Sequence, residues 1–387
     1  MKIVFVSNFF THHQSELSKS FASMNEVSYH FIETQKMDDE RKNMGWEISE
    51  LPSYVINSQY FKDNCDVCQR IIDEADVVIL GSAPPELVRT RLKNADLTFF
   101  YSERIYKNKY EAYKFPIRFI RFYRRYGQYK NAYMLCASAY AAADYAKTFT
   151  FLNKTYKWGY FPKVKQYADI DKLIELKQPS SILWVARLME WKHPELPIMV
   201  AKRLKNEGYS FQLNLIGNGQ LEGKIRQMIS DNRLEDCVHM LGTMKPEQVR
   251  EYMEQSGIFL FTSDRNEGWG AVLNESMNSA CAVVASHAIG SVPFLMNDKK
   301  NGLIYKDGDF DDLYFKTKWL LDHKIEREQL GRNAYLTMMT EWNAENASER
   351  FIQLAKRLLS GEKKLKISND GVCSQAKILK DDWYLYE

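Results

Sequence analysis

The chain has 387 residues, of which 45% are hydrophobic, and its 53 basic residues nearly balance its 50 acidic ones. This length predicts two domains, each with a core of its own. The mean hydropathy of −0.45 and the lack of an apolar run long enough to cross a bilayer argue against a membrane-spanning protein, and residues 1–7 are too short for a signal peptide.

Strands and helices are expected to alternate along the chain, which predicts parallel sheets covered by helices. In the N-terminal half, apolar runs predict strands at residues 2–6, 27–32, 76–80, 97–101 and 133–137, and helical patterns cover residues 13–22 and 85–93. A polar stretch predicts a linker at residues 162–179, and later helices are expected at residues 313–321, 326–338 and 343–359. The predicted domains are residues 1–170 and 180–360, followed by a tail at residues 361–387 that begins with a solvated charged run, residues 361–366.

The six cysteines do not form the pattern of a disulfide framework. Cys65 and Cys68 are the only close pair, and without a second such pair they are weak evidence for zinc. We therefore expect reduced thiols on a helix, no metal site and a cytoplasmic protein.

Two histidines, His12 and His13, follow the first predicted strand in a loop at the carboxyl end of a parallel sheet. Open α/β sheets bind ligands at that end, so an imidazole there is a candidate functional group. Packing of one ring on the following helix, with the other ring in solvent, would explain the pair equally well. Ser102 and Glu103 follow a later strand and are similar candidates, although an exposed ion pair with Arg104 would also account for them.

Between residues 104 and 130, cations alternate with aromatic residues. The stretch is consistent with a helix on an anionic membrane surface, with a nucleic-acid contact, or with a core helix whose rings pack inward while its cations face water. A net charge of only +3 and the lack of a nucleic-acid motif argue against the second interpretation. The cations are Lys107, Lys109, Lys114, Arg118, Arg121, Arg124 and Arg125, and the aromatic residues are Tyr106, Tyr110, Tyr113, Phe115, Phe119, Phe122, Tyr123, Tyr126 and Tyr129.

The most informative segment joins a predicted strand at residues 258–262 to a predicted helix at residues 271–280 through a turn that contains Gly268 and Gly270. A helix N-terminus has free N–H groups and a partial positive charge, which suit a phosphate, and glycines let the backbone approach it. Glu267 lies in the turn and Glu275 in the helix, so one carboxylate can hold a sugar and the other a ribose. Two glutamates alone are equally consistent with an ordinary capped surface helix.

Further motifs accompany this turn. Residues 181–187 predict a strand whose loop carries Arg187 and Lys192, and residues 213–219 predict a strand that ends in a glycine turn at Gly217. The series continues with residues 238–242, 290–293 and 301–303. From residue 181 to residue 305 the chain resembles the C-terminal half of a family 4 glycosyltransferase. The resemblance implies an α/β protein of the GT-B fold, with two Rossmann-like domains that face an interdomain cleft.

The resemblance also implies roles for individual residues. Arg187 and Lys192 would bind the diphosphate of a nucleotide sugar, Glu275 the ribose, and Glu267 the transferred sugar. Negative charge grows on the departing diphosphate, so fixed cations there stabilise the transition state more than the ground state. The candidates are Glu267 and His13 for catalysis; Arg187, Lys192, Gly217, Gly268, Trp269, Gly270 and Glu275 for the donor; and His12, Ser102 and Glu103 for the acceptor.

The activity implied is that of a retaining hexosyltransferase that needs no metal or other cofactor. It would move a sugar from a nucleotide sugar, bound by the C-terminal domain, to a saccharide or lipid-linked acceptor, bound by the N-terminal domain, during synthesis of a cell-surface polysaccharide or glycoconjugate. We expect it in the cytoplasm or on the inner face of the membrane, and we expect no nucleic-acid partner. Two alternatives remain open: a nucleotide-sugar epimerase of the same fold and a non-catalytic nucleotide-binding subunit.

Overall fold

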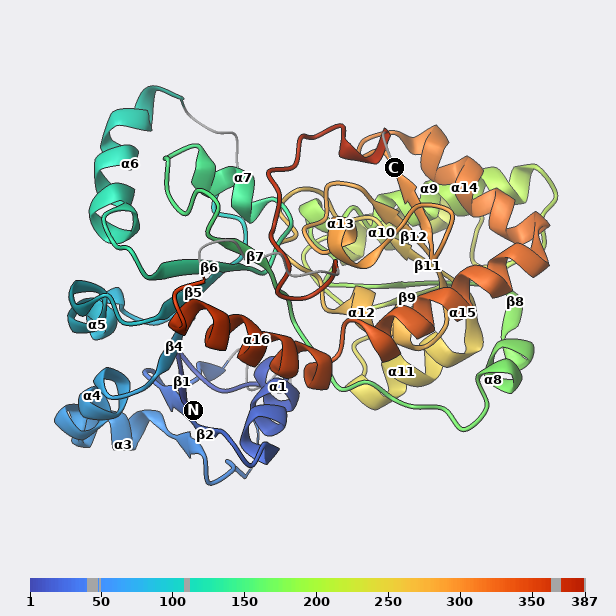
Figure 1. Cartoon of the computed structure of the whole chain (residues 1–387). Helices are drawn as coiled ribbons and strands as arrows, with labels where there is room; N and C mark the ends of the chain where they lie inside the picture. The colour runs from blue at the N-terminus through green and yellow to red at the C-terminus, as the bar shows by residue number, and fades with distance from the viewer. Residues whose placement is uncertain (40–47, 49, 108–111, 363–369, 386–387) are drawn as a thin grey trace. The chain divides into compact units, whose positions relative to one another are not determined.

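The computed structural model describes residues 1–39, 48, 50–107, 112–362 and 370–385. The chain forms two compact units (Figure 1). Unit 1 comprises Met1–Lys163 and Trp342–Lys380, and unit 2 comprises Val164–Glu341 and Asp381–Glu387. Each unit contains one parallel sheet with helices, so the expected α/β architecture is confirmed.

The sheet of unit 1 has the strand order β3-β2-β1-β4-β5-β6-β7. Its central strands are apolar because helices cover both faces of such a sheet, and every residue of β4 is buried. The strands are β1 (Lys2–Ser7), β2 (Ser28–Glu33), β3 (Val55–Ile56), β4 (Val77–Leu80), β5 (Thr98–Ser102), β6 (Ala132–Cys136) and β7 (Thr155–Lys157). The helical segments are α1 (His12–Ser23), α3 (Ser58–Asp63), α4 (Cys65–Asp73), η1 (Pro85–Val88), α5 (Arg89–Asn94), η2 (Ala112–Lys114), α6 (Phe115–Phe122), the π-helix η3 (Tyr123–Gly127), α7 (Ala141–Ala146) and α16 (Ala344–Leu359).

All five strands predicted in the N-terminal half are present, within one residue at each end. β3 and β7 are additional and too short to give an alternating pattern. The expected helix at residues 85–93 is a 3-10 turn, η1, followed by α5. All six cysteines are free, and Cys65 and Cys68 lie in α4, as the sequence predicts. Among the described residues, no helix combines the length and the apolar composition that a bilayer crossing requires.

The helix α16 packs in unit 1, beside α1 (Figure 1), although the predicted boundaries assign it to the second domain. Its Phe351 ring lies 5.5 Å from Phe21 of α1, 5.0 Å from Phe99 of β5 and 5.7 Å from Trp158, measured between ring centres. This aromatic cluster is the physical reason for the difference, because burial of rings stabilises the fold wherever their partners lie in the sequence.

The segment after α16 is also packed. Gln375 forms an isolated antiparallel bridge with Tyr156 of β7, and the Thr155 hydroxyl donates to the Ala376 carbonyl at 2.9 Å. Farther on, Trp383 of η5 (Trp383–Leu385) is buried in unit 2, and the rings of Tyr384 and His287 have centres 4.3 Å apart. The predicted charged run at residues 361–366 lies, from residue 363 on, outside the described residues.

The sheet of unit 2 has the strand order β10-β9-β8-β11-β12-β13, with all neighbours parallel. Residues 162–179, which were expected to form a linker, contain a helix, α8. The strands are β8 (Gln178–Val185), β9 (Gln212–Ile216), β10 (Val238–Gly242), β11 (Ser256–Phe261), β12 (Ala282–Ser286) and β13 (Leu303–Tyr305). The helical segments are α8 (Ile170–Leu176), η4 (Glu190–Lys192), α9 (Glu195–Asn206), α10 (Glu222–Asp231), α11 (Pro246–Gln255), α12 (Val272–Asn278), α13 (Val292–Leu295), α14 (Phe310–Asp322) and α15 (Lys324–Thr340).

Candidate functional site

In unit 2 the strand order reverses between two neighbouring strands, β8 and β11. The chain runs from β8 to β9 and β10 on one side, and from β11 to β12 and β13 on the other. In open parallel sheets, ligands bind outside the carboxyl ends of the strands at such a reversal. Arg187 and Lys192 follow β8, and Glu267 follows β11, so the fold brings these three predicted site residues to that position.

Lys192 and Glu267 form an ion pair that joins the two loops. The Lys192 ammonium contacts Oε2 of Glu267, and only 12% and 10% of the two side chains are exposed. The Ser263 hydroxyl donates to the same oxygen at 3.0 Å, and the ammonium lies 4.2 Å from the ring centre of Trp191. Removal of one partner from a buried pair leaves the other charge uncompensated, so each side chain stabilises the position of the other.

Hydrogen bonds hold the backbone of the same two loops together. The Asp264 N–H donates to the Trp191 carbonyl at 3.0 Å. The Thr262 hydroxyl donates to the Lys192 carbonyl at 2.7 Å and accepts from the Trp184 indole N–H at 2.8 Å. The loop that carries Lys192 is therefore fixed to the loop after β11 by hydrogen bonds to its carbonyl groups as well as by the Lys192 charge.

A third loop, after β9, supports the first. The Leu188 N–H donates to the Asn218 carbonyl at 2.8 Å. Gly217 has a φ of +130°, and a Cβ at this position would lie 2.0 Å from the Ala186 carbonyl oxygen. Only glycine allows this backbone approach, so Gly217 positions the loop that carries Arg187.

His193, next to Lys192, is held between two carboxylates. Its Nε2 lies 3.5 Å from Oδ2 of Asp264, and its Nδ1 lies 2.8 Å from Oε1 of Glu195. Hydrogen bonds to Asp264 and then to Glu195 raise the pKa of His193 to about 10, so the imidazole is cationic at neutral pH. Burial alone would raise the pKa of Asp264, but its hydrogen bond with His193 brings it below its ordinary value.

The Arg187 side chain is exposed, whereas the side chains of Lys192 and Glu267 are mostly buried. Among the described residues it has no ion-pair partner. Its guanidinium is thus available to a ligand with paired anionic oxygens, which it can bind through two parallel hydrogen bonds.

In the Glu267 turn, Trp269 is fully buried, and its indole N–H donates to Oδ1 of Asn274 at 2.9 Å. The Ser291 hydroxyl donates to the Trp269 carbonyl at 2.5 Å. Gly270 has a φ of +81°, and a Cβ there would lie 2.3 Å from the ring of Phe261. The Trp269 side chain therefore anchors the turn.

Glu275 lies in the first turn of α12 and is partly exposed. Burial raises the pKa of its carboxyl group, and the charge of Arg250 opposes this effect. Arg250 donates to Oδ1 of Asn278 at 2.8 Å, which places a cation beside this helix that the sequence did not indicate.

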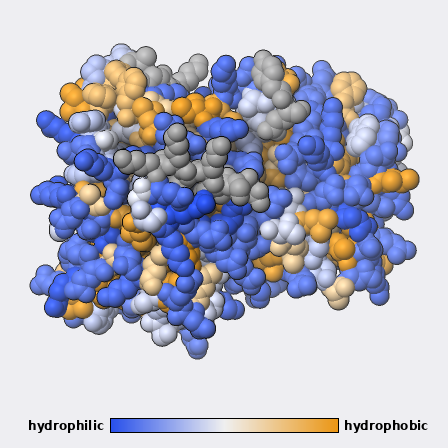
Figure 2. Space-filling model, viewed as in Figure 1, coloured by the Kyte–Doolittle hydropathy of each residue, from blue (hydrophilic) through white to orange (hydrophobic). Residues whose placement is uncertain are grey.

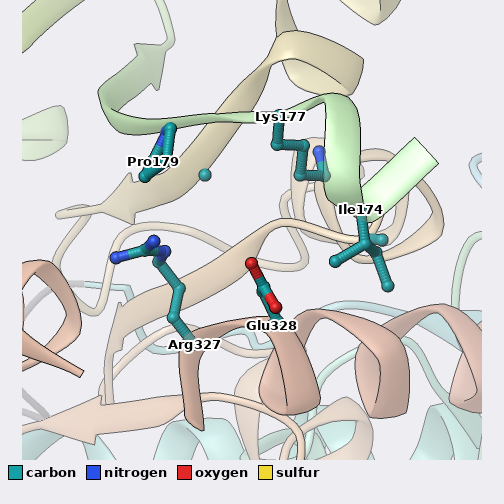
Figure 3. Close-up of a pocket in the computed structure, with 7 residues that line it drawn as sticks. Ile174, Lys177, Pro179, Arg327 and Glu328 are labelled. Atoms are coloured by element: carbon teal, nitrogen blue, oxygen red, sulfur yellow. The ribbon is translucent and has the colours of Figure 1, made fainter. Parts of the chain in front are cut away.

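A pocket at the amino end of the same sheet is structural (Figure 3). Its volume of about 10 Å³ is too small for anything larger than a water molecule. The buried Lys177 ammonium donates to the carbonyls of Met253 at 2.8 Å and Ser256 at 3.0 Å, at the end of α11. Burial lowers the pKa of Lys177, and these carbonyls satisfy the charge that remains.

In unit 1, the predicted acceptor residues and the catalytic candidate His13 lie at or just after the carboxyl ends of β1 and β5. His12 and His13 open α1, with ring centres 3.9 Å apart. His13 is stacked on Tyr160 at 5.1 Å, and the Tyr160 hydroxyl donates to Oε1 of Glu103 at 2.6 Å. Burial, and then the neighbouring His12, lower the pKa of His13 to about 3, so this imidazole is neutral at physiological pH. The Ser102 hydroxyl donates to the backbone carbonyl of Glu103 at 2.8 Å.

The arrangement in unit 2 agrees with the comparison to known families. Residues 166–337 match the family described as glycosyl transferases group 1. The match covers nearly all of unit 2, so this unit is similar to the group 1 glycosyl transferases. One relative is an amylovoran biosynthesis glycosyltransferase of Erwinia amylovora, which is 31% identical over 188 residues, or 47% of this chain and 46% of that protein. The chain thus matches about half the length of this curated relative.

Two solved structures extend the likeness to nearly the whole chain. One is TarM, with a TM-score of 0.66 and 12% identity over 92% of this chain and 98% of that one. The other is HepE of Anabaena, solved in complex with UDP, with a TM-score of 0.64 and 14% identity over 93% of this chain and 100% of that one. At this low identity the likeness concerns the fold alone, and it confirms the GT-B architecture of two Rossmann-like units.

Three contacts of the candidate sites were not apparent in the sequence. His193 adjoins the predicted Lys192, but of its two carboxylate partners Glu195 begins α9 and Asp264 lies in the loop after β11. Tyr160 lies 57 residues from Glu103, to which it donates. The position of His193 next to Lys192 in the sequence could have indicated a site residue, whereas nothing in the sequence around Tyr160 indicated its contacts.

Proposed function

We propose that this chain is a retaining glycosyltransferase that moves a sugar from a nucleotide sugar to a saccharide or lipid-linked acceptor. The observation that carries the proposal is the Lys192–Glu267 ion pair at the strand reversal of unit 2, with Arg187 exposed in the loop after β8 that also leads to Lys192. The name of the Erwinia relative supports a role in the synthesis of a cell-surface polysaccharide. UDP in the HepE structure supports a nucleotide-linked donor.

The proposed chemistry follows from the charges. Arg187 and Lys192 neutralise the diphosphate as the bond to the sugar breaks, and we propose that these fixed cations make a metal unnecessary. Glu267 exchanges its contact with Lys192 for hydroxyl groups of the sugar, while Glu275 accepts hydrogen bonds from the ribose. Attack on the same face as the departing phosphate, which can accept the acceptor's proton, gives retention without a covalent intermediate.

The acceptor side is assigned to unit 1. His13 has a pKa of about 3 and is therefore a weak base, so we propose that it orients an acceptor hydroxyl as a neutral hydrogen-bonding group. Tyr160 and Glu103 offer a stacking surface and a carboxylate. We further propose that the enzyme acts in the cytoplasm, at the inner face of a membrane where lipid-linked acceptors are present.

The test begins with a thermal-shift screen of nucleotide sugars, followed by assays for transfer to saccharide and polyprenyl-phosphate acceptors and for release of an epimerised product. Transfer supports the proposal. Turnover without an acceptor would identify an epimerase, and binding without turnover would identify a non-catalytic subunit. Arg187→Ala should weaken nucleotide binding about tenfold to a hundredfold, as expected for a charge-assisted hydrogen bond of about 1.5–3 kcal/mol. Lys202→Ala, an exposed change on α9, is the control.

A further inference from the structure

A groove in unit 1 lies between the η1–α5 segment and the α6–η3 segment, with a volume of about 600 Å³. We call it the arginine groove. Four of its lining residues are arginines, and five are apolar or aromatic residues that could contact a hydrocarbon chain. The lining consists of Pro85, Glu86, Arg89, Leu92, Ile117, Ile120, Arg121, Arg124, Arg125 and Tyr129.

The helix α6 presents two apolar faces, and only one of them packs in the unit. On the inner face, Phe119 lies 6.1 Å from Phe149, and Phe122 lies 5.9 Å from Tyr145, between ring centres. On the outer face, Ile117 is 75% exposed and Ile120 is 51% exposed. Figure 2 shows hydrophobic surface gathered in the region of α6. Exposed aliphatic side chains of this kind mark a contact surface.

The charge of the groove is strongly positive. Arg89, Arg121, Arg124 and Arg125 are exposed, and none of them forms an ion pair with a described residue. Glu86 is the one acidic residue of the lining. Arg118 does not belong to this set, because its guanidinium lies 5.0 Å from the ring centre of Tyr106, on another side of α6.

We propose that the arginine groove binds the headgroup phosphate of an anionic phospholipid, while Ile117 and Ile120 contact its acyl region. Guanidinium groups bind phosphate oxygens through paired hydrogen bonds, and aliphatic side chains next to them match a molecule that is anionic at one end and apolar at the other. The assignment rests on the membrane association proposed above and gives it a defined site. It includes Arg89 and Leu92, which lie upstream of the basic and aromatic stretch.

The test uses the full chain and sedimentation with vesicles of equal parts phosphatidylglycerol and phosphatidylcholine. The variant Arg89→Gln/Arg121→Gln/Arg124→Gln/Arg125→Gln should lose about fivefold in partitioning per arginine, or several hundredfold in all, since each basic residue at such a surface is worth ~1 kcal/mol. The matched control is Lys2→Gln/Lys19→Gln/Lys62→Gln/Arg70→Gln, which removes four exposed cations of unit 1 outside the groove. The control should lose much less. Equal losses in the two variants, or none in the groove variant, would overturn the site.

Two further arms complete the experiment. Ile117→Ser/Ile120→Ser should weaken vesicle binding while leaving its salt dependence unchanged, and no weakening would contradict the acyl contact. Inorganic phosphate is the second probe: a site for free phosphate would be saturated by it at low concentration and vesicle binding would be lost, whereas the proposed site predicts only the general effect of ionic strength. Turnover of nucleotide sugar with a soluble acceptor and no vesicles should be normal in every groove variant. If the wild type itself shows no turnover under these conditions, the result would instead contradict the proposed transferase activity.

Discussion

The carboxyl ends of the two sheets differ in their chemistry. In unit 2 the loops carry charges, with Lys192 paired to Glu267 and a cationic His193 between two carboxylates. In unit 1 the corresponding loops carry rings, with a neutral His13 stacked on Tyr160. A diphosphate needs fixed cations, whereas sugar hydroxyls need hydrogen-bonding groups and stacking surfaces. The same sheet architecture is therefore specialised by its loops, and the difference predicts which half binds the donor.

The largest expected effect tests the charged end. Lys192→Ala removes the ammonium and leaves Glu267 buried without its partner, so unit 2 should lose about 3–5 kcal/mol of stability. The same change should reduce kcat/KM at least a hundredfold. Chemical denaturation and steady-state kinetics measure the two losses, and Lys202→Ala is the control. A fully active and stable Lys192→Ala protein would contradict the central role of this pair.

A backbone substitution tests whether the charged loop depends on close packing. Gly217→Ala places a Cβ 2.0 Å from the Ala186 carbonyl oxygen at a φ of +130°. The expected loss of stability is about 2–4 kcal/mol, from strain and overpacking together. Gly223→Ala is the matched control, because its Cβ meets no atom within 4 Å and it lies in α10, where alanine favours the helix. Denaturation curves should therefore move in opposite directions, and a shift of both in the same direction would argue against the packing role.

The two glutamates of unit 2 should differ in kinetics. Glu267→Gln should chiefly lower kcat, because we propose that Glu267 contacts the reacting sugar. Glu275→Gln should chiefly raise the donor KM. Each effect is expected at about 1.5–3 kcal/mol, the value of a hydrogen bond to a charged group. Identical changes of kcat and KM in both variants would contradict this division.

In unit 1 the expected effects are smaller and fall on the acceptor. Tyr160→Phe keeps the ring against His13 but removes the hydrogen bond to Glu103. The acceptor KM should rise about tenfold, equivalent to ~1.4 kcal/mol, while the donor KM stays constant. Tyr60→Phe, an exposed change elsewhere in unit 1, provides the control. A rise in the donor KM instead would reverse the assignment of the two units.

The smallest effect concerns pH. The pKa of His193 is raised to about 10, so its contribution to stability is complete below pH 6.5 and is lost as the pH rises toward 10. The pKa values of Asp264 and Glu195 lie below their ordinary 3.8 and 4.5, so their contribution is present above pH 4.5 and is lost at lower pH. The melting temperature of the wild type should therefore exceed that of His193→Gln most between pH 4.5 and 6.5. The difference should correspond to about 1 kcal/mol, because the pair is partly exposed to solvent. If the difference in melting temperature grew above pH 8, it would contradict a raised pKa of His193.

The sequence predicted the elements of both sheets well because apolar runs and glycine turns are local signals. It predicted Glu267 and Lys192 as site residues, but their pairing required β8 and β11 to lie side by side. The contacts of Tyr160 with His13 and Glu103 join distant parts of unit 1, and a tyrosine between Gly159 and Phe161 gives no signal for them. The same holds for α16. Its apolar face is compatible with packing in either unit, and only the contacts of Phe351, such as that with Phe99, show that it packs in unit 1.

The placement of α16 has a consequence for the order of folding. Residues 164–341 supply all the strands of unit 2 and leave the ribosome before residues 342–380, which unit 1 requires. Domains generally fold in the order of their synthesis. Here unit 1 cannot complete its aromatic cluster until Phe351 has been synthesised. The sheet of unit 2 can therefore form first, although most of unit 1 is synthesised earlier. During translation, α1 and β5 should therefore expose the surface that α16 later covers, and in pulse-labelling experiments protection from exchange should appear in unit 2 before it appears in unit 1.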